Sequence, residues 1–255
     1  MKKILALLLV LTLTFLTVAL VGCDKETIDN DTDSGEVSTT DTEETTKPEE
    51  TTASVEKKEF SNDAKEIFKT LQSFVTDDIN YFHMDFEMTG AGHFIYTVAE
   101  NGKYVSATQE GQVTEMYLIN NVGYVKNPEV NGFIATSDSD MVATINTSFE
   151  FVEMFKTFCF TDEVERDVID SSTAVVSDSE LGGIKVTFTD KDDPNSVFII
   201  ETDSKVYEIV EDGEVIGSEI TKIRVTVSGI EDGQTMRLDC LYTQINGNIT
   251  LKSPI

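Results

Sequence analysis

The sequence predicts an α+β domain whose strongly curved antiparallel sheet, a half-barrel of roughly ten strands, has two helical segments covering its open side. Short segments of alternating apolar and polar residues recur from residue 82 to residue 244. One segment with helical spacing precedes this series, and a second interrupts it. Roughly ten strands are too many for a flat open sheet. A curved sheet with the helices against it would bury the apolar faces of both.

The first helical segment is predicted to begin at Asp63 and to end near residues 77–78. Asp63, followed by Glu66 three residues later, matches a capping box. The apolar residues that follow have the spacing of one helix face. They are Ala64, Ile67, Phe68, Leu71, Phe74 and Val75. This face requires a partner surface in the folded domain.

An antiparallel meander is predicted to follow. In residues 82–88, Phe and Met alternate with His, Asp and Glu, which is typical of a half-buried strand. The dipeptide Asn101-Gly102 indicates a two-residue hairpin between two such strands. The further strands of this run are expected at 94–98, 104–109, 113–119, 122–125 and 133–134.

A second helical region is predicted over residues 139–159, capped by Ser139 or Asp140. The rest of the chain again has the pattern of strands and turns. These strands are expected at 174–177, 184–189, 196–201, 205–211, 214–217, 222–227 and 235–244. About 195 residues in this order are most economically a single domain, which we place at residues 61–255.

The N-terminus has the order of a secretory signal. Lys2 and Lys3 precede a long apolar run that ends in Leu20-Val21-Gly22-Cys23, with charged residues directly after it. This end resembles the lipobox of bacterial lipoproteins. The resemblance implies that residues 1–22 form a signal peptide cut between Gly22 and Cys23, and that the Cys23 sulfur carries a diacylglyceryl group. The alternative is an uncleaved N-terminal helix; in both cases the domain lies on the extracytoplasmic face of the bacterial cell membrane.

A linker is predicted between this anchor and the domain. Residues 23–60 are rich in Thr, Asp, Glu and Ser and contain few large apolar side chains. Such a composition buries too little surface to offset the entropy of ordering, so we expect it to be disordered. It would act as an acidic spacer that lifts the domain off the membrane.

Charge excludes some partners. The chain has a formal net charge of -28. Nucleic acid is therefore not an expected partner, because binding it requires clustered Lys and Arg. The domain is also not expected to lie flat on anionic lipid, so the predicted contact with the membrane is the lipid anchor alone. No protein partner can be identified from the sequence.

No catalytic set, metal site or cofactor motif is present, and the protein is not expected to be an enzyme. His83 and His93 lie in adjacent predicted strands. They could form a metal pair or a base, although exposed strand histidines are commoner. Cys159 and Cys240 could form a disulfide or remain as two separate buried thiols.

The domain as a whole offers a second resemblance. A helix, an aromatic-rich meander containing "TEMYLINNVGYVKNP", a second helix and further strands follow one another over residues 61–255. This order resembles the half-barrel of the outer-membrane lipoprotein carriers and of the mycobacterial cell-envelope lipoproteins that hold lipids. The resemblance implies a deep curved sheet with an apolar cavity under helical lids.

The amino-acid composition also concerns the expected apolar cavity. Fifteen Phe and seven Met, with no Trp, suit an adaptable pocket for a hydrophobic ligand, and they equally suit an ordinary core. We expect a lipid-anchored module that binds or carries a lipid or other hydrophobic ligand. The alternative is a structural or interaction lipoprotein of the cell surface without a small-molecule ligand. The expected cavity lining is Phe82, Met84, Phe86, Met88, Phe94, Tyr96, Met116, Tyr117, Phe149 and Phe155.

Overall fold

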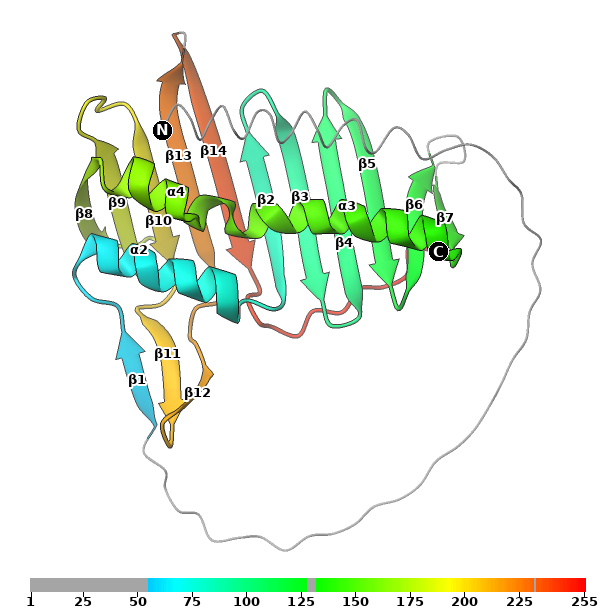
Figure 1. The fold of residues 1–255 in the computed structure, drawn as a ribbon, viewed down its shortest axis with the longest axis horizontal. Coiled ribbons are helices and arrows are strands. Elements are labelled where there is room, and N and C mark those ends of the chain that lie inside the picture. Colours follow the sequence, from blue (N-terminus) through cyan, green and yellow to red (C-terminus); the bar gives the residue numbers. More distant parts are fainter. Residues whose placement is uncertain (1–54, 128–131, 232) are drawn as a thin grey trace, which may run out of the picture.

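The dominant feature of the computed structural model is a wide antiparallel sheet with its helices on one face (Figure 1). The structure describes residues 55–127, 132–231 and 233–255. The predicted signal peptide, the lipobox with Cys23 and most of the predicted linker lie outside the described residues.

The main sheet has 11 strands in the order β7-β6-β5-β4-β3-β2-β14-β13-β10-β9-β8. One half is a meander that runs outward from β2 to β7, and the other half comes from the C-terminal part of the chain. The last strand, β14, joins the halves by pairing with β2. The strands are β2 (Phe82–Met88), β3 (Gly92–Ala99), β4 (Gly102–Gln109), β5 (Gln112–Ile119), β6 (Val122–Asn127), β7 (Gly132–Thr136), β8 (Ser172–Asp178), β9 (Ile184–Asp190), β10 (Val197–Thr202), β13 (Ile223–Glu231) and β14 (Gln234–Thr243).

This architecture confirms the predicted α+β class and the large antiparallel sheet. The sheet is not closed, because β7 and β8 are its two ends and do not pair with each other. Its register places apolar residues of neighbouring strands on one face. Phe86 of β2 lies opposite Phe94 of β3 on one side and Cys240 of β14 on the other.

The first helix begins where it was predicted. Helix α2 (Ala64–Ser73) continues as a π-helical turn, η1 (Phe74–Asp78). The side chain of Asp63 accepts hydrogen bonds from the backbone N–H groups of Lys65 and Glu66. Two of the N–H groups that lack a helical partner at the helix start are thereby satisfied.

The second helix, α3 (Ser139–Thr157), is capped by Asp138 and not by Ser139 or Asp140 as predicted. The Asp138 carboxylate accepts from the N–H groups of Asp140 and Met141, both at 3.1 Å. The cap is one residue earlier than the nearer predicted position because Ser139 already has helical backbone geometry. Three short helical turns follow α3: η2 (Phe158–Phe160), α4 (Asp162–Val164) and η3 (Glu165–Ile169).

A second sheet of three strands was not predicted. It consists of β1 (Glu56–Glu59), β11 (Val206–Glu211) and β12 (Glu214–Gly217), in the order β1-β11-β12. The prediction of a disordered linker up to residue 60 is therefore wrong at its end. The segment is ordered by its ladder to β11, by ion pairs of Lys57 with Glu219 and of Lys58 with Glu208, and by the Phe60 ring, 5.1 Å from that of Tyr207.

The core lies between the main sheet and its helices. Helix α2 and the turns after α3 cover the strands from β8 to β13, and α3 crosses the strands from β2 to β7 (Figure 1). Phe68 of α2 packs on Phe188 of β9 and Phe198 of β10, with ring centroids 6.5 and 6.4 Å apart. In the part of the chain that the structure describes, no helix is long and apolar enough to cross a membrane.

Candidate functional site

The candidate site is the face of strands β2 to β5 that lies under α3. Alternation along β2 places Phe82, Met84, Phe86 and Met88 on this face, each at most 2% exposed. Pairing then carries the apolar surface across the sheet. Phe94 and Tyr96 of β3, Val105 of β4 and Met116 of β5 extend it.

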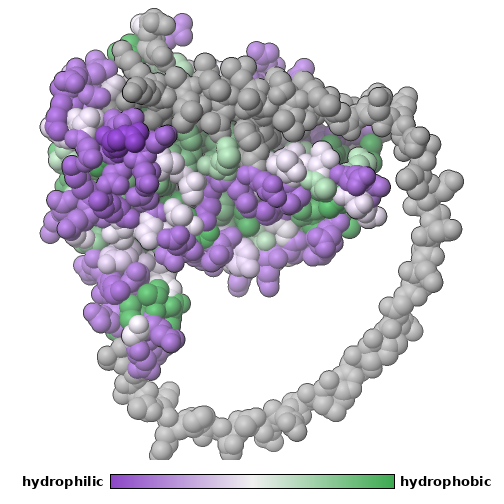
Figure 2. Space-filling model, in the orientation of Figure 1, coloured by the Kyte–Doolittle hydropathy of each residue, from purple (hydrophilic) through white to green (hydrophobic). Residues whose placement is uncertain are grey.

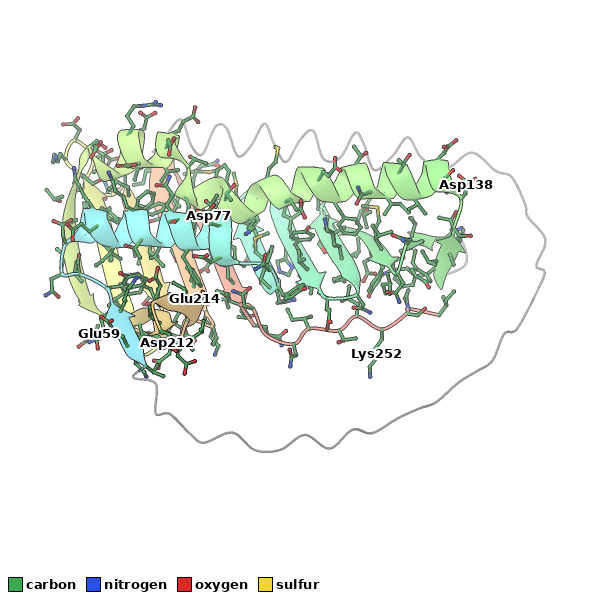
Figure 3. The ribbon with its side chains drawn as sticks, turned by 60° about the horizontal axis from the view of Figure 1, so that its bottom comes forward. Glu59, Asp77, Asp138, Asp212, Glu214 and Lys252 are labelled. Carbon is green, nitrogen blue, oxygen red and sulfur yellow. The ribbon has the colours of Figure 1, made fainter. Side chains whose placement is uncertain are left out.

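Helix α3 closes this surface with two aromatic rings. The ring of Phe155 lies 5.6 Å from that of Phe86 and 6.2 Å from that of Phe94. Six residues earlier in the helix, the ring of Phe149 stacks on that of Tyr96 at 6.2 Å. Figure 3 shows side chains filling the space between α3 and the strands. The helix therefore rests on the sheet through aromatic contacts.

The structure brings together all of the predicted lining residues except Tyr117. The others lie on the helix side of the sheet or in α3, and none of them is more than 8% exposed. Tyr117 lies on the opposite face, because it follows Met116 directly in a strand and adjacent strand residues point to opposite sides. Its ring is 4.4 Å from that of Tyr104 and 5.4 Å from that of Phe133.

The predicted lining residues also fill the space that they were expected to enclose. Phe86, Phe94 and Phe155 contact one another, and Phe82 packs against Tyr96 at 5.6 Å. A ligand could reach this surface only if α3 moved. The interior as described is the closed form of such a site or a permanently packed core.

Three polar side chains interrupt the apolar interface at one point. The Lys103 ammonium group donates to Oε1 of Glu153 in α3 at 2.6 Å, and the Tyr96 hydroxyl donates to the same oxygen at 3.5 Å. Burial, followed by the nearby Glu153 carboxylate, raises the pKa of Tyr96 well above its ordinary value. Tyr96 therefore acts here only as a neutral donor. These side chains link the middle of α3 to strands β3 and β4 by polar contacts.

The C-terminal end of α3 is fastened more firmly. The buried Tyr242 hydroxyl donates to the carbonyl oxygen of Lys156 at 2.7 Å. The Lys156 ammonium group donates to the carbonyl oxygen of Ile79 at 2.6 Å. Burial lowers the pKa of Lys156, although the carboxylates of Glu153, Asp77 and Asp78 oppose this shift. These contacts tie the helix end to β14 and to the residue after η1.

The N-terminal half of α3 is held more lightly. Between its first residue and Ile145 no side chain is buried. Ile145 itself lies over Gly123 of β6, where a Cβ atom would collide with its Cδ1 atom. Met141 is 45% exposed. Movement of α3 about its C-terminal end would therefore uncover β6 and β5 first.

A small polar cleft lies elsewhere, between α2 with η1 and strand β11. It measures about 210 Å³ and is lined by Thr70, Ser73, Phe74, Asp78, Tyr207 and Glu208. Burial raises the pKa of Asp78, and the carboxylates of Asp77 and Glu208 add to this. None of the predicted lining residues reaches this cleft. Its hydroxyl and carboxylate lining does not suit a hydrophobic ligand.

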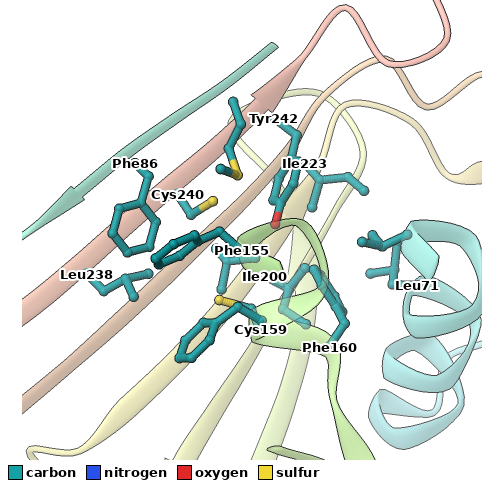
Figure 4. Packing of buried hydrophobic residues seen from close by; sticks show 14 of the residues in the cluster. Leu71, Phe86, Phe155, Cys159, Phe160, Ile200, Ile223, Leu238, Cys240 and Tyr242 are labelled. Atoms are coloured by element: carbon teal, nitrogen blue, oxygen red, sulfur yellow. The ribbon is translucent and has the colours of Figure 1, made fainter. Parts of the chain in front are cut away.

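The two remaining cysteines are free thiols. Cys159 of η2 and Cys240 of β14 are both buried and point into the layer between the sheet and the helices (Figure 4). Burial raises the pKa of Cys159 to about 12. Of the two alternatives left by the sequence, the structure therefore has separate buried thiols.

The two histidines do not form a pair. His83 lies opposite Thr97, and His93 lies opposite Glu87, so they are separated by four residues along the sheet. That separation is about 13 Å, too far for one metal ion. His83 Nδ1 is 2.9 Å from Thr97 Oγ1, and His93 Nε2 is 2.7 Å from Asp85 Oδ1. Over the described ranges, no group of three His, Cys, Asp or Glu side chains could hold a metal ion.

Sequence reasoning missed Lys103, Glu153, Lys156 and Tyr242. Lys103 could have been found, because it falls on the inward side of its strand, two residues before the apolar Val105. Glu153 likewise falls four residues after Phe149, on the apolar side of its helix. Charged residues at such inward positions require a partner, and here each is the partner of the other.

Comparisons with known proteins assign no family. No family model matches the chain, and no curated protein matches its sequence.

Proposed function

We propose that this protein is a lipid-anchored extracytoplasmic binding module, and that it takes up a lipid or other hydrophobic ligand between α3 and the sheet. The observation that carries the proposal is the continuous apolar face of β2 to β5. Among the described residues, one helix, α3, covers this face. That helix is fastened at its C-terminal end and held lightly at its N-terminal half. Helix α3 then acts as a lid.

The proposal includes the half-barrel form expected from the sequence. Helices α2 and α3 lie on one face of an unclosed sheet, as a half-barrel with helices on its concave side would require. Methionines at Met84, Met88 and Met116 give that face adaptable side chains beside the aromatic rings. Binding would proceed by transfer of the apolar ligand from water as the lid opens. No catalytic residue is needed.

The alternative is a cell-surface interaction protein without a small-molecule ligand. The observation that favours it is the close packing of the predicted lining residues, which leaves the interior filled in the described form. An exposed apolar patch offers a second surface for such contacts. Val215 and Ile216 of β12 are each 57% exposed, and Figure 2 shows a hydrophobic patch over the small sheet.

A disulfide across the lid distinguishes the two proposals. Gly123→Cys and Ile145→Cys would place two thiols where a Cβ atom on β6 already meets the Ile145 side chain. The variant is purified without reducing agent, and the new bond is verified by mass. Uptake of a fluorescent fatty acid is then measured before and after reduction, so that the reduced protein is the matched control.

We expect uptake by the wild-type protein and by the reduced variant, and its loss in the oxidised variant. Equal uptake by the oxidised and reduced forms would show that α3 is not the lid. No uptake by any form, the wild type included, would favour the interaction protein.

A further inference from the structure

Strand β8 forms one free edge of the main sheet. It pairs with β9 on one side and, among the described residues, with nothing on the other. Its side chains are small or β-branched. Val175, at its centre, is 65% exposed. Such an edge carries a row of unpaired N–H and C=O groups that can pair with another strand.

The register with β9 shows which backbone groups point outward. On either side of β8, Lys191 donates to the carbonyl oxygen of Ser171, and Ser179 donates to that of Gly183. Antiparallel ladders alternate, so the odd-numbered residues of β8 bond to β9. The even-numbered residues therefore present their N–H and C=O groups to the outside. They are Ser172, Ala174, Val176 and Asp178.

This edge lacks the usual protection against pairing. Natural edges carry lysine, proline or a bulge, whereas residues 172–177 contain no charge and no proline, and their register with β9 is unbroken. The one charged residue, Asp178, is at the end and is paired with Lys205 at 2.7 Å. In a chain with a net charge of -28, most surfaces would repel a second copy. Strand β8 is a part of the surface where this electrostatic repulsion is absent, because residues 172–177 carry no charge.

We infer that β8 pairs with β8 of a second copy, antiparallel and centred on Val175, so that two main sheets become one. In this register Ser172 faces Asp178 of the partner subunit, and Ala174 faces the partner's Val176. These are the outward-pointing residues, so each hydrogen-bonding group meets a complementary one. Val175 faces the partner's Val175 as a non-hydrogen-bonded pair, about 4.5 Å apart between Cα atoms.

The interface is small. One pair of strands buries less area than stable dimers need, so the association is expected to be weak in dilute solution. Confinement of the protein at a surface would raise the local concentration and strengthen it. The inference does not depend on the ligand proposal, because β8 is remote from the face under α3 (Figure 1).

A single cysteine at the centre of the strand tests the inference. The full chain carrying Val175→Cys is expressed in cells, exposed briefly to a mild oxidant and separated on a non-reducing gel. The expected Cα separation lies within the range of disulfides. We expect a disulfide-linked dimer that disappears on reduction.

Two controls accompany this experiment. The wild-type chain reports any cross-linking by its native cysteines. Val113→Cys places a thiol at a residue that is 45% exposed but belongs to an interior strand, and it should give no dimer. If Val175→Cys gives no more dimer than Val113→Cys, the inference is overturned.

A charge variant provides an independent measurement. Val175→Lys would place two ammonium groups against each other across the interface, whereas Val175→Thr keeps a β-branched side chain. Sedimentation equilibrium over a range of concentrations should show self-association of the wild type and of Val175→Thr. The lysine variant should lose it. A wild type that stays monomeric at the highest concentration, together with no cross-link, contradicts the proposed dimer.

Discussion

At the residue scale, Gly123 shows how closely α3 approaches the sheet. A methyl group at this position would meet Ile145 Cδ1 and would lie 3.3 Å from Thr136 Cγ2. We predict that Gly123→Ala lowers the free energy of unfolding by about 1–3 kcal/mol, the usual cost of overpacking. Urea denaturation measures this change.

A double-mutant cycle locates the cause. If the Ile145 side chain is what the new methyl group meets, Ile145→Ala should cost less in the Gly123→Ala background than in the wild type. Equal costs of Ile145→Ala in both backgrounds would mean that the strain lies elsewhere.

Asp239 provides a pH-dependent test on the other face of the sheet. Arg224 donates two hydrogen bonds to this carboxylate, at 2.9 and 2.8 Å, and Arg237 donates a third at 3.0 Å. Burial alone would raise the pKa of Asp239, but the two guanidinium groups outweigh burial and lower it. The folded state therefore favours the ionised carboxyl group more than the unfolded state does.

The sign of the effect follows from this shift. The stabilisation is complete above the unfolded pKa of about 3.9 and is lost as the pH falls through the lower folded value. We predict that Asp239→Asn costs about 1–2 kcal/mol at pH 7 and progressively less below about pH 4. Denaturation curves from pH 7 to pH 2 measure the difference. A cost that does not change with pH would contradict the assigned ion pairs.

At the element scale, β1 extends the domain beyond its predicted start at residue 61. We predict that a chain beginning at residue 61 exchanges the backbone amides of β11 and β12 faster than a chain beginning at residue 55. The reason is that β11 loses the ladder to β1 and the hydrogen bond from the Phe60 N–H to the Lys205 carbonyl oxygen. Hydrogen exchange followed by mass spectrometry measures this, with β13 as the internal control. Unchanged exchange in β11 would show that β1 contributes nothing to the small sheet.

The same scale shows what the sequence could predict. The strand at 82–88 has the bounds that alternation indicated, since one buried face fixes both its length and its orientation. The dipeptide Asn101-Gly102 located the hairpin between β3 and β4 for the same local reason. Strand β1, by contrast, has the sequence Glu-Lys-Lys-Glu and every residue exposed, so its order depends on distant partners. No local pattern indicates such a strand.

The alternation of apolar and polar residues along the strands predicted the candidate site only as far as such a pattern can. Residues two apart in a strand, such as Phe94 and Tyr96, were placed together correctly. Tyr117 was misplaced because Met116 and Tyr117 are adjacent and both apolar, so hydrophobicity alone could not decide which one faces inward. The hydrogen bond that holds the C-terminal end of α3 joins the Tyr242 hydroxyl to the carbonyl oxygen of Lys156, 86 positions away in the chain. Spacing along the sequence carries no information about such a contact.

At the scale of the whole molecule, the proposed lipid anchor depends on Cys23. We predict that the wild-type chain enters the membrane fraction with a mass that includes a diacylglyceryl group on a chain beginning at Cys23. Cys23→Ala should keep its signal peptide, because the resemblance to a lipobox requires the modified cysteine for cleavage. Intact mass spectrometry of both proteins checks this. A wild-type mass without added lipid contradicts the anchor.

The central claim is that α3 is a lid over a face that binds a hydrophobic ligand. The most direct measurement is native mass spectrometry of the mature protein purified from its own envelope, followed by organic extraction and lipid analysis. The account predicts a bound lipid of defined mass, which is extracted into solvent and leaves the apo protein behind. A clean apo mass that persists after incubation with envelope lipids would contradict it and would direct attention to protein partners.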